Sequence, residues 1–280
     1  MRAVHTKFDR PAIIQDDWAD RLILPAERTA LAAAIPGGAS VSTDPDRILH
    51  AAWKNTSVYG GVILRTRYTE DRVAAAAARG VTQYVIIGAG FDSYALRQPL
   101  AGAAMRVYEV DHNASQQLKR QRIEQSGVHI PSMLRFVPAD LSREDLGEAL
   151  RRSDFQFDQP AILSWLGVTV YLTREANFAT LRSIARFAAS GSELIFTYIE
   201  DRALHSTSPA MLAARAVLAR VGEPWLSGFD PAALPAELSA IGLHLEEDLS
   251  GADKYARYCS QRTDGFTAGT VGHIAAVRVE

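Results

Sequence analysis

Two apolar segments, each ending in residues suited to holding a ligand, constrain this 280-residue sequence more than any other feature. Residues 83–87 lead into Gly88-Ala89-Gly90, and residues 106–110 end at Asp111, 23 positions after Gly88. Glycine lets the backbone turn tightly and approach a ligand closely. A carboxylate at the end of the next strand is placed to accept both hydroxyl groups of a ribose. The pair predicts a nucleotide-type pocket at the carboxyl end of a parallel sheet.

Apolar segments and helical segments alternate through the middle of the chain. The predicted strands are 83–87, 106–110, 134–138, 161–165 and 192–199. The predicted helices between them lie near 112–125, 143–152 and 173–189. This alternation, with strands that are apolar along their whole length, is typical of a parallel sheet covered by helices on both faces. The sequence therefore predicts an α/β fold.

The two ends of the chain predict additions to that core. Three helices, at 17–35, 45–54 and 66–79, precede the first strand and form a candidate cap over the pocket. A helical segment at 203–221 follows the core, and then come a helix near 231–241 and two strands, 243–248 and 271–279, that are suited to antiparallel pairing at one edge. We predict one domain, divided into an N-terminal helical cap (1–80), a cofactor-binding core (81–200), a lid insertion (201–228) and C-terminal core strands (229–280).

Composition narrows the possible functions. The net charge of −2, from 30 basic and 32 acidic residues, gives no electrostatic case for binding nucleic acid. A single cysteine, Cys259, excludes an internal disulfide and a multi-cysteine zinc site, and we expect it to be a small buried residue. The histidines lack metal-ligand spacing, so no metal is predicted. No apolar run reaches the ~18 residues that a membrane span needs, and the start lacks a signal peptide, which predicts a cytoplasmic protein without a membrane partner.

An ordered set of motifs extends over about residues 65–265. It consists of Arg65-Thr66-Arg67-Tyr68, Gly88-Ala89-Gly90-Phe91-Asp92-Ser93 with Arg97, Glu109-Val110-Asp111, Ala139-Asp140-Leu141, residues 164–172, and the tail Arg257-Tyr258, Arg262 and Asp264-Gly265. This set resembles the class I S-adenosylmethionine-dependent methyltransferases. It is most similar to the leucine carboxyl methyltransferase family, including bacterial relatives that act on polyketides.

The resemblance implies a fold and a cofactor. The fold would be Rossmann-like, with a mainly parallel seven-stranded sheet, helices on both faces and an antiparallel strand at one edge. The cofactor would be S-adenosyl-L-methionine. The loop of Gly88, Ala89 and Gly90 would pass under its methionine part, and Asp111 would hold its ribose.

The remaining cofactor contacts are implied in the same way. Asp140 would accept from the adenine amino group, with the Leu141 backbone nearby. Arg65 or Arg67 would grip the cofactor's carboxylate, for which the guanidinium fork is suited because it can donate two parallel bonds.

Several of these residues also fit structural roles. Asp111 and Asp140 each precede a predicted helix, where an aspartate can cap the first turn. Arg65 and Arg67 also fit a solvated helix end. Glu109 lies inside an apolar strand, and because a buried carboxylate needs a partner, Arg97 or another cation is expected beside it.

One position departs from the family. Alignment on Tyr171-Leu172 places Leu166 where many relatives carry a glutamate. Some bacterial relatives read Trp-Leu-Gly-Val at this point, so the resemblance holds. The cofactor contact made by that glutamate is not expected in this chain.

The acceptor pocket is less well defined than the cofactor site. The candidate lining residues are Trp165, Tyr198, Tyr255, Arg257, Tyr258 and His205. No His/Asp pair stands in a catalytic setting, and a carboxylate acceptor, with a pKa near ~4, needs no base, whereas a phenol near ~10 would profit from one. We therefore expect an O-methyltransferase that acts on a carboxylate or acidic hydroxyl of a small molecule, in secondary metabolism.

Two other classes remain open at this point. A nicotinamide-dependent oxidoreductase would also use the glycine pair and Asp111, but Ser93 stands where the third glycine of G-x-G-x-x-G belongs. A non-catalytic S-adenosylmethionine-binding protein is suggested only by Leu166. Binding of S-adenosylhomocysteine or of NADH separates the first class from a methyltransferase.

Overall fold

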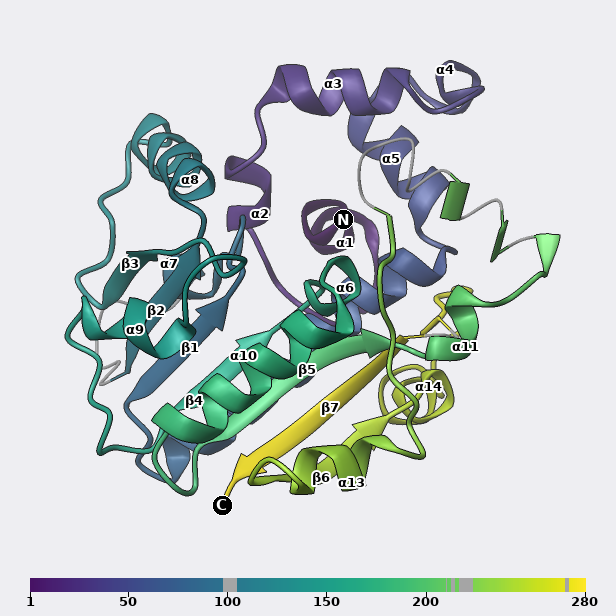
Figure 1. Ribbon diagram of the computed structural model, residues 1–280. Helices are drawn as coiled ribbons and strands as arrows, with labels where there is room; N and C mark the ends of the chain where they lie inside the picture. Colours follow the sequence, from purple (N-terminus) through teal and green to yellow (C-terminus); the bar gives the residue numbers. More distant parts are fainter. Residues whose placement is uncertain (98–104, 210, 213–214, 217–223, 270–271) are drawn as a thin grey trace.

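A seven-stranded sheet organises the chain, with the strand order β3-β2-β1-β4-β5-β7-β6 (Figure 1). The computed structural model describes residues 1–97, 105–209, 211–212, 215–216, 224–269 and 272–280. The strands are β1 (Gln83–Ile87), β2 (Arg106–Asp111), β3 (Leu134–Pro138), β4 (Ile162–Trp165), β5 (Glu193–Ile199), β6 (Leu243–Leu249) and β7 (Gly272–Val279). All neighbours pair in parallel except β7, which is antiparallel to β5 and to β6. The predicted fold class is confirmed. The antiparallel strand is β7, which lies second from the edge because β6 is the edge strand.

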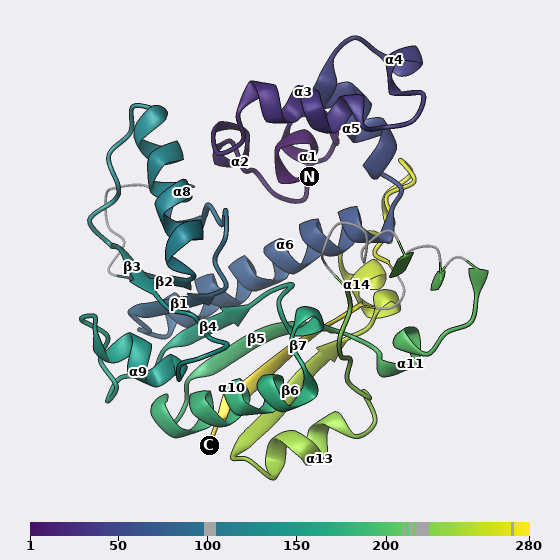
Figure 2. The ribbon, with the colours of Figure 1, turned by 45° about the horizontal axis from the view of Figure 1, so that its top comes forward.

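Helices cover both faces of the sheet, and the strands bury side chains on both (Figure 2). In β1, Val85 and Ile87 contact one core cluster while Tyr84 and Ile86 contact the other. One face is packed by α9 (Leu146–Arg151), α10 (Arg174–Phe187) and α13 (Leu234–Ser239). The opposite face is packed by α6 (Ser57–Ala78), α7 (Tyr94–Arg97) and α8 (Asn113–Gln125). This double burial explains why the inner strands are apolar throughout.

The N-terminal helices form a cap with its own apolar cluster. They are α1 (Arg2–Phe8), α2 (Trp18–Arg21), α3 (Pro25–Ala33), α4 (Gly38–Val41) and α5 (Pro45–Trp53). The predicted helix 17–35 is divided, because Pro25 fits the first turn of a new helix and α2 ends before it. Asp44 caps the start of α5, since its side chain accepts a 2.9 Å hydrogen bond from the Asp46 amide. Helix α1 was not predicted.

The long helix α6 begins at Ser57, well before the predicted start at 66. Gly60 and Gly61 lie in its first turns, where glycine has a low intrinsic helix propensity. Gly60 is required by a tertiary contact, because a Cβ at this position would lie 1.7 Å from the Thr267 carbonyl oxygen. Close packing of the chain against α6 therefore overrides helix propensity.

Besides α13, the described C-terminal part contains the helices α11 and α14 and a bulge. Short α11 (Asp201–Leu204) follows β5, and α14 (Gly251–Tyr258), which was not predicted, follows β6. Residues 210, 213–214 and 217–223 of the predicted lid lie outside the described residues. A β-bulge between Leu245 and Glu247 changes the alternation of β6, so that Asp248 pairs with Ala275 and lies on the α10 face.

Candidate functional site

The glycine loop at the end of β1 has the backbone that the sequence predicts. Gly88 and Gly90 have φ angles of 67° and 48°, in the left-handed region that favours glycine. A Cβ at Gly88 would lie 2.6 Å from Val168 Cγ2, whereas a Cβ at Gly90 would meet nothing within 4 Å. The loop is therefore closed on the side of Val168 and open at Gly90, where a ligand can approach the backbone.

Asp111 joins the end of β2 to this loop. One of its carboxylate oxygens accepts from the Gly90 amide at 2.5 Å, and the other accepts from the His112 amide at 2.6 Å. A carboxylate oxygen has two lone pairs, so each oxygen can still accept a further hydrogen bond. The Asp111 carboxylate is thus held beside Gly90 and can still accept hydrogen bonds from a ligand.

Asp140 forms a turn after β3. Its Oδ1 accepts from the Ser142 hydroxyl at 2.6 Å and from the Ser142 amide at 3.1 Å. The hydrogen bonds from Ser142, more than the nearby Arg143, hold the pKa of this carboxyl below its usual range. Leu141 lies beside it, partly buried against the core. The structural role suggested by the sequence is present, and the adenine contact stays a prediction.

The two arginines of the Arg65-Thr66-Arg67 motif lie in different environments. Arg67 is exposed and pairs with Asp71 at 2.9 Å on the outer side of α6. Arg65 points to the carboxyl end of β4, where a Cβ on Gly167 would lie 2.3 Å from its Nη1. No hydrogen bond or ion pair joins Arg65 to another residue of the described chain, and burial lowers the pKa of its guanidinium to about 10.

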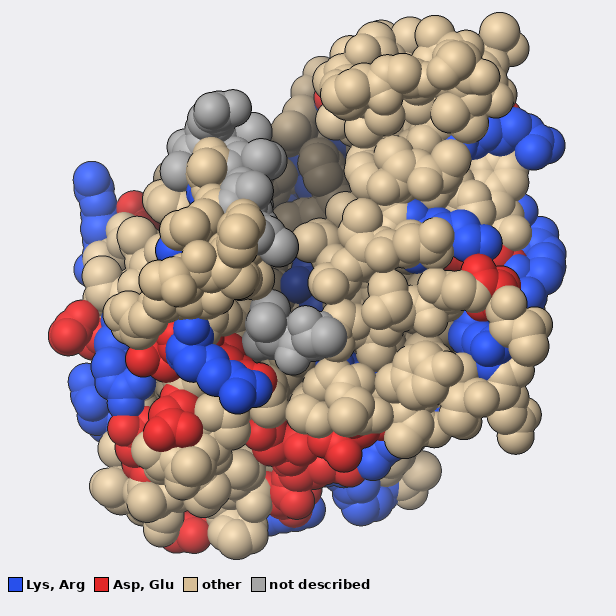
Figure 3. Space-filling model, turned by 90° about the vertical axis from the view of Figure 1, so that its right-hand side faces the viewer, with Lys and Arg blue, Asp and Glu red and all other residues tan. Residues whose placement is uncertain are grey.

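Arg65 lines a cavity of about 310 Å³ at the carboxyl ends of β4 and β5. Its other described lining residues are Met1, Val58, Gly61, Val62, Gly167, Thr169, Val170, Tyr171, Thr197, Tyr198, Ile199, Trp225, Lys254, Gly272, His273 and Ile274. Figure 3 shows a hollow on the side of the molecule that carries α11 and α14, with basic side chains in its depth. None of the described lining residues is acidic.

A polar cluster lies at the β5 and β7 side of this cavity. Tyr198 and His273 are directly opposite each other in the sheet, and their rings stack with centroids 4.9 Å apart. His273 Nδ1 lies 2.9 Å from Asp248 Oδ2, which also accepts from the Tyr198 hydroxyl at 2.7 Å. His273 Nε2 lies 3.3 Å from Glu200 Oε1. With a carboxylate at each ring nitrogen, the cluster favours the imidazolium form.

The pKa values in this cluster follow from its contacts. Burial alone would lower the pKa of His273, but Asp248 and Glu200 together raise it above its ordinary value. Burial and the hydrogen bond to Asp248 raise the pKa of Tyr198 far above its ordinary value. Tyr198 is therefore a neutral hydroxyl whose proton is donated to Asp248.

Lys254, from α14, is a further basic side chain of the cavity. The residue is 3% exposed, and its ammonium group donates to the Gly272 carbonyl. Burial lowers the pKa of Lys254 to about 8, partly opposed by Asp248 and Asp253. The amine is protonated at neutral pH. Sequence reasoning missed Lys254 and His273, because neither residue belongs to a motif that marks it as part of a site.

Of the acceptor-pocket candidates from the sequence, only Tyr198 lines this cavity among the described residues. Trp165 is fully buried in the core beneath it, and its indole nitrogen has no hydrogen-bond partner in the described chain. His205 is exposed and lies 3.6 Å from Asp201.

The other three candidates come from α14, where Tyr255 and Arg257 are exposed and Tyr258 is partly buried. Tyr255 is 45% exposed. Arg257 pairs with Glu247, and the Tyr258 hydroxyl donates to Asp71 at 3.4 Å. These contacts fix α14 against β6 and α6.

The partner of the buried Glu109 is Lys119, at 2.6 Å, and both side chains are 1% exposed. Arg97 instead pairs with Glu70 and Asp16. Burial raises the pKa of Glu109 to about 7, with Lys119 opposing the shift. The expectation of a cation beside Glu109 is confirmed, and its identity is Lys119 rather than Arg97. Cys259, as expected, is buried.

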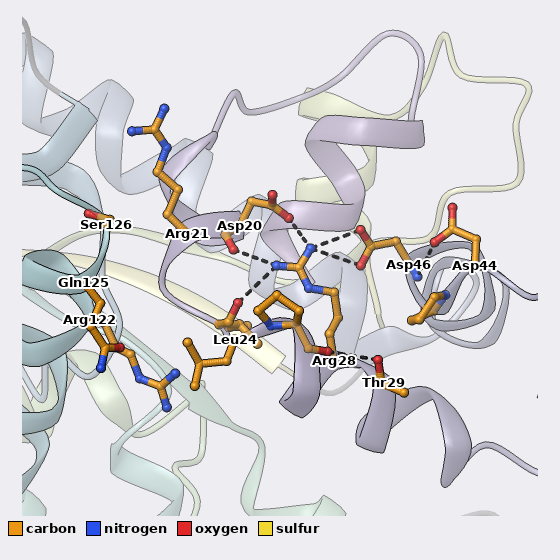
Figure 4. A pocket seen from close by; sticks show the side chains of 13 residues that line it. Asp20, Arg21, Leu24, Arg28, Thr29, Asp44, Asp46, Arg122, Gln125 and Ser126 are labelled. Atoms are coloured by element: carbon orange, nitrogen blue, oxygen red, sulfur yellow. Dashed lines mark hydrogen bonds and ion pairs between the residues drawn. The ribbon is translucent and has the colours of Figure 1, made fainter.

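A larger hollow, of about 590 Å³, lies between the cap and the end of α8. Figure 4 shows Arg28 at its centre, with its guanidinium directed at Asp20 and Asp46. Arg28 bonds to both aspartates, and Lys7 joins the same group. Because these charges neutralise one another and lie away from the strand ends, this hollow is a weaker candidate for the site than the smaller cavity.

The sheet order, with one antiparallel strand beside the edge and a glycine turn after β1, defines a class I methyltransferase. The comparisons extend this from class to family. The leucine carboxyl methyltransferase family model matches residues 1–185, and the chain belongs to that family. It is an S-adenosylmethionine-dependent methyltransferase, which excludes the oxidoreductase alternative.

The relatives agree over most of the chain. YktD of Bacillus subtilis, assigned as an S-adenosyl-L-methionine-dependent methyltransferase, is 30% identical over 99% of this chain and 94% of its own length. A protein of Mycolicibacterium gilvum with the same assignment is 32% identical over 68% of this chain and 61% of its own length. A solved structure from Thermobifida fusca, assigned as a methyltransferase, has the same fold, with a TM-score of 0.60 at 17% identity and coverage of 98% and 99%.

The described residues fit the cofactor. Gly90 leaves open space on its Cβ side, Asp111 retains acceptor capacity beside it, and Arg65 has a guanidinium without an anionic partner. Backbone, carboxylate and guanidinium are the three types of group that a nucleoside with an amino-acid tail requires. No helix of the described chain is both long and apolar enough to cross a membrane.

Proposed function

We propose that this methyltransferase transfers a methyl group to an oxygen atom of a small molecule, either a carboxylate or an acidic hydroxyl. The observation that carries the proposal is the cavity at the carboxyl ends of β4 and β5, because its volume of about 310 Å³ suits a small molecule and its described lining has basic groups without acids. A small acceptor of this kind, rather than a protein, favours a role in secondary metabolism.

Within this proposal the cofactor site follows the ends of neighbouring strands. Gly88, Ala89 and Gly90 provide backbone for close approach, Asp111 receives the ribose hydroxyl groups, and Asp140 with Leu141 borders the adenine. Arg65 holds the carboxylate, since Arg67 is paired with Asp71 on the outside. The loop and Asp111 are hydrogen-bonded to each other, which keeps the two contacts in a fixed relation.

S-adenosylmethionine supplies a methyl group on a positively charged sulfur. The protein must place the acceptor oxygen and exclude water, and good alignment can contribute on the order of 7–11 kcal/mol. A carboxylate is already ionised at neutral pH and needs no base. The neutral Tyr198 hydroxyl, the Thr169 and Thr197 side chains and the basic groups of the cavity then act by orientation.

Isothermal titration of the purified chain with S-adenosylhomocysteine, with NADH as the control, tests the cofactor site. Asp111→Ala should weaken binding by about 1–3 kcal/mol, because charge-assisted hydrogen bonds are lost. Wild-type affinity in this variant would remove Asp111 from the site.

Mass spectrometry of the products from a panel of carboxylic acids and phenols tests the transfer. Formation of methyl esters or ethers supports the proposal. Methylation confined to nitrogen or sulfur acceptors in a matched panel would refute it.

A further inference from the structure

Among the described residues, three basic side chains line the cavity, namely Arg65, His273 and Lys254. His273 is held between Asp248 and Glu200, and of the other two only Arg65 has a specific role in the proposed function. Arg65, on α6, is assigned to the carboxylate of the cofactor. Lys254, on α14, faces the same cavity beside β5 and β7. Its only hydrogen bond in the described chain goes to the Gly272 carbonyl, and no described carboxylate lies within ion-pair distance of it.

The nearby acids are engaged elsewhere. Asp248 accepts from Tyr198 and His273. Glu200 pairs with Arg202 and His273. Asp253 closes the capping box at the start of α14 by accepting from Ser250. Each carboxylate that could neutralise Lys254 is therefore held by other donors.

An unpaired ammonium group that is buried costs free energy, because the group loses its hydration without gaining an anion. A carbonyl acceptor offsets only part of this cost. Lys254 lies at the cavity wall, and the surrounding carboxylates are occupied by other partners. The ammonium group is therefore suited to pairing with an anion that enters the cavity.

Resting on the proposed function, we propose that Lys254 binds the negatively charged group of the methyl acceptor and selects anionic acceptors, carboxylates foremost, over neutral ones. The charge also distinguishes substrate from product. A carboxylate pairs with the ammonium group, whereas its methyl ester carries no charge and loses that pairing. The same contact therefore favours binding of the acid and release of the ester.

The test uses three probes, namely benzoate, phenylacetate and octanoate, each with its primary amide as the neutral control. They are titrated into wild-type protein with and without S-adenosylhomocysteine, and into K254M and K254R. K54M is the matched lysine control, because Lys54 lies at the end of α5 and does not line the cavity. Affinity for S-adenosylhomocysteine and the unfolding midpoint are measured for each variant.

We expect wild-type protein to bind at least one carboxylate more tightly than its amide. K254M should weaken that binding by about 10- to 100-fold, in line with the loss of one charged hydrogen bond. K254R, which keeps the charge but cannot act as a base, should retain binding to within about tenfold. S-adenosylhomocysteine binding should be unchanged in all variants, whereas a purely structural lysine would change it.

Three results would overturn the proposal: equal carboxylate affinity in wild type and K254M, no carboxylate binding by wild type, or equal loss in K254M and K254R with intact cofactor binding. Product analysis separates this proposal from the one on which it rests. Carboxylates that bind through Lys254 without forming esters refute O-methyl transfer alone. Esters that form equally fast in K254M refute the role of Lys254 alone.

Discussion

Two clusters in this molecule are built from the same residue types and differ in what surrounds them. In the cap, Asp9 accepts from the Tyr59 hydroxyl at 2.6 Å, and its oxygens lie 2.6 Å from His5 Nδ1 and 2.7 Å from His50 Nε2. At the cavity, Asp248 meets Tyr198 and His273. The first joins α1, α5 and α6, while the second joins strands β5, β6 and β7.

The surroundings decide what each cluster can do. His5 is fully buried, and its Nε2 accepts from the Ile13 amide at 2.8 Å, so Nδ1 carries the proton and donates it to Asp9. Both ring nitrogens of His5 are therefore engaged within the described part of the chain. His273 lies between two carboxylates and lines the cavity. The Tyr–His–Asp cluster around Asp9 therefore connects helices, whereas the cluster around Asp248 contributes residues to the wall of a cavity.

The largest effect is expected from Asp9→Ala. Three buried donors lose their acceptor at once, so the free energy of unfolding should fall by about 3–5 kcal/mol. Urea denaturation measures this, with the exposed Asp17→Ala as the control. A loss below about 1 kcal/mol would show that water satisfies the cap cluster and that the contrast with the cavity is weaker than described.

Asp248→Ala should lower stability less than Asp9→Ala does and should affect binding of the acceptor. The Asp248 side chain is 17% exposed, against 2% for Asp9, so water can replace it, and we expect the free energy of unfolding to fall by only about 1–2 kcal/mol. The KM for the acceptor should rise, because Tyr198 and His273 lose their orientation. Denaturation and steady-state kinetics on one preparation measure both. Unchanged kinetics would mean that the cluster around Asp248 has only a structural role, like the cluster around Asp9.

The clusters should respond to pH in opposite directions. The hydrogen bonds from His5, Tyr59 and His50 outweigh burial and hold the pKa of Asp9 far below its ordinary value, so its contribution is present above about pH 4 and is lost as the pH falls. The pKa of His273 is raised, so its contribution is complete below about pH 6.5 and is lost as the pH rises through the raised value.

The measurement is the difference in unfolding free energy between wild type and His273→Gln from pH 6 to pH 9. We expect it to shrink by about 1 kcal/mol as the pH rises. A difference that is constant over this range would mean that His273 does not titrate differently in the folded and unfolded states.

The smallest effect is expected from Tyr198→Phe. This change removes one hydroxyl group. Because His273 still donates to Asp248, the free energy of unfolding should change by about 1 kcal/mol or less. Tyr59→Phe in the cap provides the matched comparison and should cost more, since its hydroxyl is sealed from water. Equal costs in calorimetric unfolding would show that access to the cavity does not matter.

The arrangement of the residues proposed to hold the cofactor was predictable from the sequence because its signals are local. Gly88, Gly90 and Asp111 each follow directly on an apolar strand, and the bounds of those strands were correct to within one or two residues. A parallel sheet brings such strand ends together without further information. The cap helix α5 was predictable for the same reason, through the local Asp44-Pro45 signal.

The acceptor side was not predictable, because distant segments assemble it. His273 meets Tyr198 only when β7 inserts between β5 and β6, and Asp248 joins them only because of the bulge in β6. The sequence directed attention to Tyr255, Arg257 and Tyr258. Without knowledge of α14, nothing indicated that Lys254, one position earlier, is the residue that faces the cavity.

The bulge in β6 has a second consequence, for how the molecule behaves among its copies. β6 is the last strand of the sheet, so one side of its backbone is available for pairing with another chain. The irregularity after Leu245 and the three consecutive acids, Glu246, Glu247 and Asp248, interrupt that edge. A flat, uncharged strand in the same place would favour sheet extension between molecules, whereas an irregular and charged edge disfavours it.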